Sequence, residues 1–208
     1  MLVKTLINSH VNSNTYILFK KEHKKCVVID PGFSILKTIE FIKTNSLNVQ
    51  YILLTHEHFD HVFGVNKLFD LYDAKIISSI ECSKRVVDSK TNLSYFYISK
   101  GLNVYKPNKI LKDNETICFL NDNIKMIKTK GHSDGSVCYV VNDYLFTGDT
   151  ILKDEKIITK LPTGSTDLLN ESINKLANNI KFPKKIFPGH GDEFYINSKQ
   201  QFLKLLNL

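Results

Sequence analysis

The sequence predicts an α/β fold in which mixed β-sheets are covered by helices. Runs rich in Val, Ile, Leu and aromatic residues, typical of strands, alternate with segments whose apolar residues recur at helical spacing. Several strand-like runs follow one another closely, as in hairpins, whereas others are separated by a helical segment. The sheets are therefore expected to be mixed and to carry helices on their faces.

Length and composition favour one globular domain. A chain of 208 residues can bury a full core without disulfides, so we expect a single domain over residues 1–208. Hydrophobic residues at 42% and charged residues at 24% are ordinary globular values. No apolar run approaches the roughly 20 residues of a membrane span, and the start, MLVKTLINSHVNSN, lacks a signal-peptide core. A cytoplasmic protein with no membrane partner is expected.

The first half of the chain alternates predicted strands with two helices. The expected strands are residues 2–7, 15–19, 26–29, 49–54 and 74–78. Ile35, Ile39 and Ile42 recur at helical spacing and predict the first helix. A second helix is expected from about Asp60, with one apolar face made of Val62, Val65, Leu68, Phe69 and Tyr72.

The second half begins after an irregular stretch, residues 91–107. Its aromatic residues, Tyr95, Phe96, Tyr97 and Tyr105, leave two interpretations open, a wall of a cleft or local packing. Residues 151–165 are a second candidate wall. The expected strands are residues 117–120, 124–129, 136–141, 144–146 and 185–187, and the expected helices are residues 167–179 and 197–206.

The net charge and the cysteines do not indicate a special function. The formal charge is +7, but the lysines are spread along the whole chain, so a solvated basic surface is favoured over a nucleic-acid-binding stripe. The four cysteines contain no C-x-x-C pair, and we expect them to be reduced core residues. They are Cys26, Cys82, Cys118 and Cys138.

Histidines and acids follow the ends of four predicted strands. The segment THEHFDH, residues 55–61, follows the strand 49–54. His132, Asp149 and His190 stand in GHSDGS, LFTGDT and FPGHGD, each just after a strand. Loops on one rim of a rigid scaffold are where sites are built, so a metal site is expected there. A zinc-protease helix is excluded, because the position four after His56 is Asp60.

Seven donors are more than the four that one tetrahedral zinc ion takes. Two divalent ions are therefore expected, zinc first, with iron or manganese also suited to imidazole and carboxylate ligands. Each ion would keep one position open for water, as catalytic sites do. The first ion is assigned His56, His58 and His132, the second Asp60, His61 and His190, and Asp149 bridges them.

Together, THEHFDH, GHSDGS, LFTGDT and FPGHG, with NTYILF and VVIDPG upstream, resemble the metallo-β-lactamase-fold hydrolases over nearly the whole chain. The resemblance implies a four-layer αββα sandwich with the metals in a cleft at one edge of the two sheets. Matched by position, it gives the same ligand sets and the same bridging acid. Asp30, in VVIDPG, matches a buried acid that supports the metal loop without binding metal.

Within that superfamily the segments are most similar to the short glyoxalase II-like branch, which hydrolyses thioesters such as S-lactoylglutathione. Full-length glyoxalase II has a further helical region that grips glutathione, whereas only residues 191–208 follow His190 here. The segment that commonly reads Gly-Arg-Xaa-Asp is residues 157–160, Ile-Ile-Thr-Lys. Asp134 replaces a proline of the family pattern and is expected to face solvent.

The resemblance implies a metal-dependent thioesterase whose substrate is a small acyl thioester or ester. A hydroxide formed from water shared by the two ions would attack the acyl carbon. Asp149 and Asp60 are the candidate catalytic residues, the first as the bridge and the second to orient the hydroxide.

Other functions of the same fold stay open. One is a mononuclear-iron persulfide dioxygenase, which uses the equivalent of His56, His58 or His132, and Asp149. Others are a lactonase or β-lactamase, and an RNA-processing nuclease, although no inserted RNA-gripping segment is found. A non-catalytic metal-binding module is disfavoured by the full donor set, and the oligomeric state is not readable from the sequence.

Overall fold

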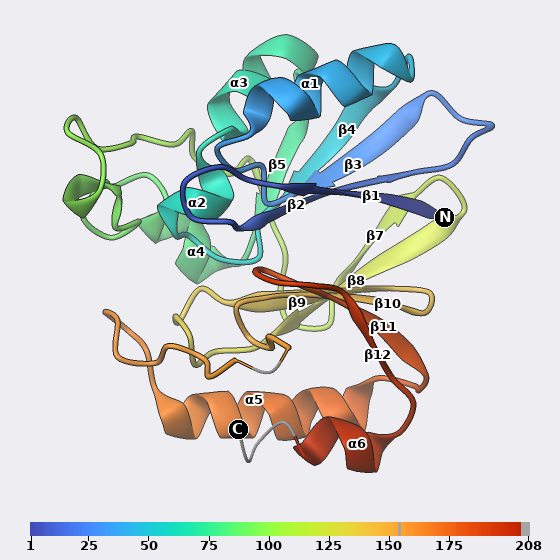
Figure 1. Ribbon diagram of the computed structural model, residues 1–208, viewed down its shortest axis with the longest axis vertical. Helices are drawn as coiled ribbons and strands as arrows, with labels where there is room; N and C mark the ends of the chain where they lie inside the picture. Colours follow the sequence, from blue (N-terminus) through green and yellow to red (C-terminus); the bar gives the residue numbers. More distant parts are fainter. Residues whose placement is uncertain (154, 205–208) are drawn as a thin grey trace. The chain divides into compact units, whose positions relative to one another are not determined.

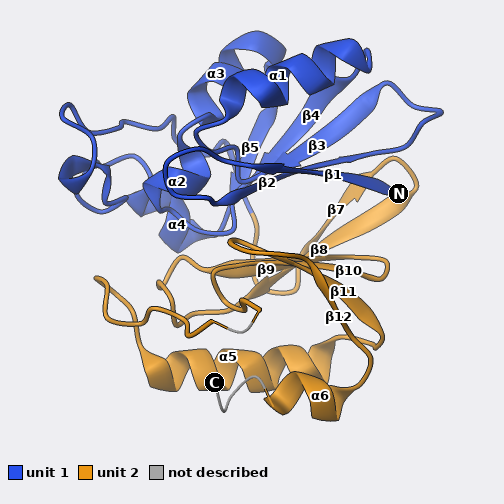
Figure 2. Ribbon diagram, viewed as in Figure 1, with its two compact units in different colours: residues 1–110 blue, residues 111–208 orange. Residues whose placement is uncertain are grey.

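The computed structural model describes residues 1–153 and 155–204 (Figure 1). The chain divides into two compact units, residues 1–110 and 111–208 (Figure 2). Each unit contains one six-stranded sheet. The single domain over residues 1–208 stays a prediction.

Unit 1 is a mixed sheet with the strand order β1-β2-β3-β4-β5-β6. Strands β1, β2 and β3 pair antiparallel, whereas β3, β4, β5 and β6 pair parallel. The strands are β1 (Leu2–Ile7), β2 (Asn14–Phe19), β3 (Lys25–Ile29), β4 (Asn48–Leu53), β5 (Lys75–Ser78) and β6 (Lys109–Ile110). The helices are α1 (Ile35–Thr44), α2 (Phe59–Val62), α3 (Val65–Tyr72) and α4 (Ile80–Arg85), followed by the 3-10 turn η1 (Ser94–Phe96).

Helices α1 and α3 cover one face of this sheet (Figure 1). Ile35, Ile39 and Ile42, the predicted apolar stripe of α1, are all buried in a cluster with residues of the central strands. Val65 and Leu68 of α3 join the same cluster. These residues recur at helical spacing because they form the apolar face of each helix that packs against the sheet.

The single helix expected from about Asp60 is wrong, because the structure has two helices, α2 and α3, with Gly64 between them. Gly64 approaches Ile35 so closely that a Cβ atom would lie 2.6 Å from Ile35 Cδ1. Its N–H donates to the Pro31 carbonyl oxygen at 2.7 Å. The apolar spacing continues through the break, so the sequence pattern does not reveal it.

Unit 2 is a second mixed sheet with the strand order β12-β11-β10-β9-β8-β7. Only β10 and β11 pair parallel, and the other neighbouring strands are antiparallel. The strands are β7 (Thr116–Phe119), β8 (Asp122–Lys128), β9 (Val137–Val141), β10 (Tyr144–Gly148), β11 (Lys184–Pro188) and β12 (Phe194–Ile196). The helices are α5 (Thr166–Asn179) and α6 (Lys199–Leu203). Part of the predicted closing helix 197–206 lies outside the described residues.

Helix α5 packs on one face of the unit 2 sheet through Leu169, Ile173 and Leu176. Its N-terminus is capped by Ser165, whose side chain accepts a hydrogen bond from Leu168 N at 3.3 Å. Phe202 of α6 is fully buried in the same cluster.

The elements that the sequence does not predict are short, namely α4, η1, β6 and β12.

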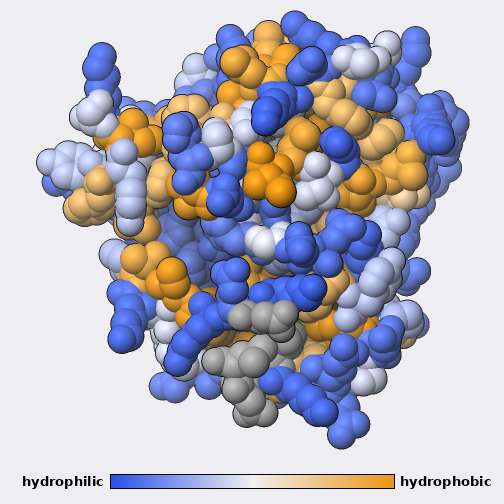
Figure 3. Space-filling view, viewed as in Figure 1, coloured by the Kyte–Doolittle hydropathy of each residue, from blue (hydrophilic) through white to orange (hydrophobic). Residues whose placement is uncertain are grey.

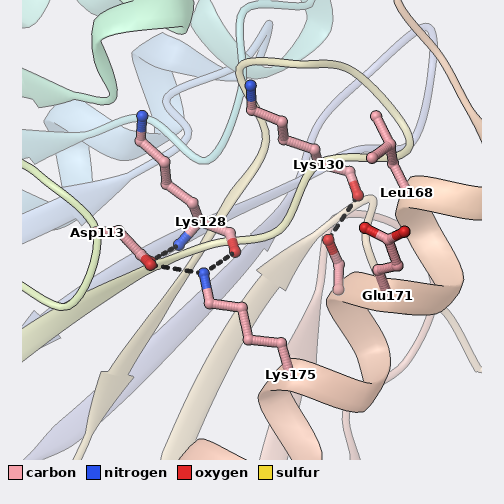
Figure 4. A pocket seen from close by; sticks show the side chains of 7 residues that line it. Asp113, Lys128, Lys130, Leu168, Glu171 and Lys175 are labelled. Carbon is pink, nitrogen blue, oxygen red and sulfur yellow. Dashed lines mark hydrogen bonds and ion pairs between the residues drawn. The ribbon is translucent and has the colours of Figure 1, made fainter.

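A second set of contacts ties α5 to the end of β8 (Figure 4). Lys175 Nζ pairs with Asp113 Oδ2 at 2.7 Å and donates to the Lys128 carbonyl oxygen at 3.0 Å. Burial alone would raise the pKa of Asp113, but hydrogen bonds from Lys175 and Lys128 lower it below its ordinary value. Ser172 Oγ donates to the Lys130 carbonyl oxygen at 2.7 Å. These contacts brace the segment that leads to His132.

None of the described helices is long and apolar enough to cross a membrane. On the face seen in Figure 3, hydrophobic residues are scattered among hydrophilic ones.

Cys26, Cys82 and Cys138 are buried as expected, but Cys118 is exposed, so the expectation that it is a core residue is wrong. Ile117 and Phe119 point into the core on β7, and strand alternation turns Cys118 to the other face.

We expect iodoacetamide to alkylate Cys118 in the folded chain and to spare the other three thiols until the chain unfolds. Burial raises the pKa of both Cys26 and Cys138 to about 12, which leaves little reactive thiolate at about pH 8. Mass spectrometry after brief labelling measures this, with Cys118→Ser as the control. Fast labelling of Cys26 in the native protein would contradict its placement in β3.

Candidate metal centre

Four of the predicted ligands lie together in unit 1, directly after β4. His56 and His58 stand on the extended segment between β4 and α2, and their ring centroids are 4.7 Å apart. Both are buried, with 1% and 5% of their surface exposed. The expected proximity of these two imidazoles is therefore found.

Asp60 and His61 lie on α2, in its first turn. The ring centroids of His61 and His56 are 4.4 Å apart. His61 Nε2 lies 3.3 Å from Asp60 Oδ2. The Asp60 carbonyl oxygen accepts a hydrogen bond from Ser13 Oγ at 2.8 Å, which fastens this turn to the start of β2. Both side chains are buried.

Asp30, at the end of β3, organises this ligand loop. Its Oδ1 atom accepts from Thr55 N at 2.8 Å, and its Oδ2 atom accepts from Thr55 Oγ1 at 2.6 Å. Oδ2 also lies 3.3 Å from His61 Nδ1. Because both carboxylate oxygens of Asp30 are occupied by the loop, Asp30 supports the ligands and is not itself assigned as one, although its oxygen lies near His56 and His61.

These contacts determine which ring nitrogen of each histidine carries a lone pair. Thr55 gives its only hydroxyl proton to Asp30, so its oxygen can only accept from His56 Nδ1, 3.0 Å away. His61 Nδ1 likewise donates to the Asp30 carboxylate. In both rings Nε2 is then the nitrogen with the lone pair, which is the arrangement that a metal-binding imidazole needs.

His132 stands in unit 2, in the loop between β8 and β9. Its Nδ1 atom is 2.8 Å from the Ile158 carbonyl oxygen, which can only accept, so Nε2 again carries the lone pair. Gly131 precedes it with φ +146°, and a Cβ atom there would lie 2.4 Å from Leu169 Cα. The loop can therefore lie directly against α5 only with glycine at this position.

Asp149 and His190 follow β10 and β11, the parallel pair of unit 2. Gly189 N donates to the Gly148 carbonyl oxygen at 2.8 Å, which holds the two strand ends side by side. Asp149 Oδ2 lies 3.4 Å from His132 Nε2 and 3.6 Å from His190 Nε2. One carboxylate oxygen is thus near two imidazole nitrogens.

These spacings fit divalent metal ions. Two ligands about 2.1 Å from a tetrahedral ion are about 3.4 Å apart, and the three nitrogen–oxygen separations are 3.3, 3.4 and 3.6 Å. An imidazole lone pair and a carboxylate oxygen at this separation repel one another unless a cation or proton lies between them. The four proposed ligands of unit 1 and the three of unit 2 form two groups. Their union in one centre stays a prediction.

Two partners of the proposed ligands were not predicted from the sequence, Thr55 and the Ile158 carbonyl group. Thr55 adjoins His56 in the sequence, so its contact with the imidazole could have been inferred. The Ile158 carbonyl lies 26 residues from His132, and no sequence motif indicates that the two meet. The expectation that Asp134 faces solvent is wrong. Its side chain is half-buried with Oδ1 shielded from solvent, and its N–H donates to Thr163 Oγ1 at 3.1 Å.

Comparisons with known proteins cover most of the chain. The family model for the metallo-beta-lactamase superfamily matches residues 9–190. A probable polyketide biosynthesis zinc-dependent hydrolase of Bacillus velezensis, BaeB, is 29% identical over 175 residues, which cover 84% of this chain and 71% of that protein. A hydroxyacylglutathione hydrolase of Buchnera aphidicola is 30% identical over 205 residues, which cover 90% of this chain and 71% of that protein.

The fold has a similar counterpart among solved structures. The structure of BLEG-1, described as a B3 metallo-beta-lactamase, matches with a TM-score of 0.88 at 25% identity, over 98% of this chain and 97% of that one. This likeness confirms the α/β fold class that the sequence analysis predicts.

We expect Asp30→Asn to lower metal affinity by about 10- to 100-fold and the free energy of unfolding by about 1–3 kcal/mol. Asn tolerates the positive φ of 50° at this position, so the change removes acceptor capacity and leaves the backbone preference intact. Metal titration and thermal unfolding measure the two effects.

The matched control is Asp70→Asn, because Asp70 is an exposed acid on α3 of the same unit. An Asp30→Asn variant that binds metal as tightly as the Asp70→Asn variant would show that Asp30 does not orient the ligands.

Proposed function

The chain belongs to the metallo-β-lactamase superfamily and is a metal-dependent hydrolase, and from this premise we propose that it hydrolyses acyl thioesters at a binuclear centre. His56, His58 and His132 would hold the first ion, and Asp60, His61 and His190 the second. Asp149 would bridge them. Zinc is the first choice of metal, and iron or manganese suits the same ligands.

The observation that carries the binuclear proposal is the place of Asp149. Its Oδ2 atom lies within 3.6 Å of the Nε2 atoms of both His132 and His190, which are assigned to different ions. A carboxylate between two such imidazoles is where a bridging ligand belongs. His132 cannot use Nδ1 instead, because that atom is engaged with the Ile158 carbonyl oxygen.

Divalent ions bound by these ligands would supply an acidified water and would polarise the scissile carbonyl group. The residues of the chain orient the reactants. Asp60, buried and fixed by Ser13 through its own carbonyl oxygen, presents its carboxylate beside His61 and would accept a hydrogen bond from the attacking water. Asp30 and Thr55 keep the imidazoles in the ligating tautomer. The chain therefore needs no serine or cysteine nucleophile.

The substrate class rests on the relatives. The Buchnera aphidicola protein is named for hydroxyacylglutathione hydrolysis, which is the cleavage of a thioester. We extend that reaction class, with S-lactoylglutathione or a related small acyl thioester as substrate, to this chain. A lactone, a persulfide or RNA as substrate would use the same ligands or most of them, so the donor set does not choose among these substrates.

We expect Asp149→Asn to lose at least one of the two ions and to lower kcat/KM by at least about 100-fold, because a neutral amide bridges two cations poorly. Metal content by atomic emission and thioester turnover are measured on the same preparation. Asp143→Asn is the control, since the Asp143 side chain in unit 2 is 84% exposed. Full metal content with an unchanged rate would rule out the bridging role.

We also expect release of free thiol from S-lactoylglutathione or from simpler acyl thioesters, by protein loaded separately with zinc, iron or manganese. A thiol-reactive dye follows the reaction, and a metal-free sample is the blank. Absence of turnover on every thioester, with bound metal demonstrated, would reject the thioesterase proposal and leave the lactone, persulfide and RNA alternatives ahead of it.

A further inference from the structure

The long segment between α4 and β6 in unit 1 is a folded excursion closed at its base (Figure 1, green). Asn92, fully buried, donates through Nδ2 to the carbonyl oxygens of Val86 and Leu102 at 2.9 and 2.8 Å. Its Oδ1 atom accepts from Ser94 N, and Ser94 Oγ accepts from Leu102 N at 2.7 Å. These bonds make the excursion a defined structure, not a loose loop.

The tip of the excursion carries three consecutive aromatic residues that are largely exposed. Tyr95, Phe96 and Tyr97 keep 58%, 67% and 69% of their surface accessible. Contiguous apolar surface that stays exposed tends to mark a binding site.

Tyr97 connects this tip to the ligand loop. Its ring stacks on Phe59 with centroids 4.8 Å apart and an interplanar angle of 18°. Phe59 stands in the sequence between the predicted ligands His58 and Asp60, and its N–H donates to the Asn92 carbonyl oxygen at 2.9 Å. The excursion is therefore fastened to the ligand loop through both a backbone bond and an aromatic stack.

The three rings differ in their surroundings. Tyr95 lies under Lys90 Nζ, 5.7 Å from its ring centroid, and meets Phe96 edge-on at 5.5 Å. Phe59 is only 6% exposed and continues inward to Phe33, whose ring is 5.9 Å away. Tyr97 packs one ring face on Phe59, the residue between the predicted ligands His58 and Asp60, and still keeps most of its surface accessible.

We propose that Tyr97, stacked on Phe59, is a substrate-binding wall that recognises an extended apolar or aryl acyl group of the thioester. This inference rests on the thioesterase proposal and deepens it, because among acyl thioesters it favours those with a long apolar acyl group over the small lactoyl thioester. A group attached to a carbonyl carbon held by the ligands of this loop would run out along the neighbouring aromatic surface. Burial of methylene or aryl groups against the ring would then contribute to binding.

The acyl side is favoured over the thiol side for a chemical reason. Biological thiols that form thioesters, such as glutathione, carry polar amide groups close to the sulfur atom, so an aromatic wall gains little from burying them. The acyl group is the half of the molecule that can be apolar. A preference for long acyl groups would thus separate this chain from an enzyme tuned to the small, polar lactoyl group.

The test is a series of straight-chain thioesters from acetyl to octanoyl on one thiol, with a second series that varies the thiol on a constant acetyl group. We expect kcat/KM to rise about twofold for each added acyl methylene and to change little along the thiol series. In Tyr97→Ala the octanoyl-to-acetyl ratio of kcat/KM should fall about tenfold, and Tyr97→Phe should retain it. If kcat/KM rises with the size of the thiol and not with the length of the acyl chain, the assignment of the wall to the acyl side is overturned.

The matched control is Tyr195→Ala, because Tyr195 is 61% exposed on β12 of the other unit. This variant should keep the wild-type chain-length ratio. If Tyr97→Ala and Tyr195→Ala alter the ratio equally, or if the wild type shows no chain-length preference, the wall does not exist as proposed.

Binding without turnover separates this inference from the thioesterase proposal. Calorimetry with the thioether S-octylglutathione would be compared with S-methylglutathione, on wild type and Tyr97→Ala. Here the apolar chain sits on sulfur only to make an uncleavable probe of the wall. Tighter octyl binding that is lost in Tyr97→Ala supports the wall even if no thioester is cleaved. Thioester turnover with equal binding of both thioethers would reject the wall and retain the function.

Discussion

The Asp30 carboxylate holds the ligand loop of unit 1 in place, and the candidate site depends on this interaction. It lies at the end of β3 and accepts from both the backbone and the hydroxyl group of Thr55, while also facing His61 Nδ1. Through Thr55 it also determines the tautomer of His56. A single buried acid thus orients two imidazoles, and their Nε2 atoms become available to a metal ion only because their Nδ1 atoms are engaged.

Unit 2 achieves the same orientation with different atoms. His132 is oriented by a backbone carbonyl group, that of Ile158, and its loop is held against α5 through Gly131 and Ser172. Asp149 and His190 are placed by the parallel pairing of β10 and β11. The proposed ligands therefore follow strand ends in both units, where the rigid backbone of the sheet fixes the positions of side chains.

Burial of this many polar groups is costly unless their charges and hydrogen bonds are compensated. Asp30, Thr55, His56 and His61 have at most 2% of their surface exposed, and the bonds among them offset much of the desolvation cost. Divalent cations would compensate the remaining carboxylate charge, so metal binding and local stability are expected to be coupled. The aromatic stack of Tyr97 on Phe59 adds an apolar boundary beside this polar cluster.

Local patterns in the chain were enough to predict most strands and the α1 stripe, and to propose seven metal ligands, because periodicity and short motifs are properties of neighbouring residues. The break at Gly64, the exposure of Cys118 and the partial burial of Asp134 were not predictable in this way. Each depends on what packs against the residue from elsewhere in the fold. The same holds for the Ile158 carbonyl group that orients His132 and for the placement of Tyr97 on Phe59. Contacts between residues distant in sequence leave no periodic signal, so only the folded chain decides them.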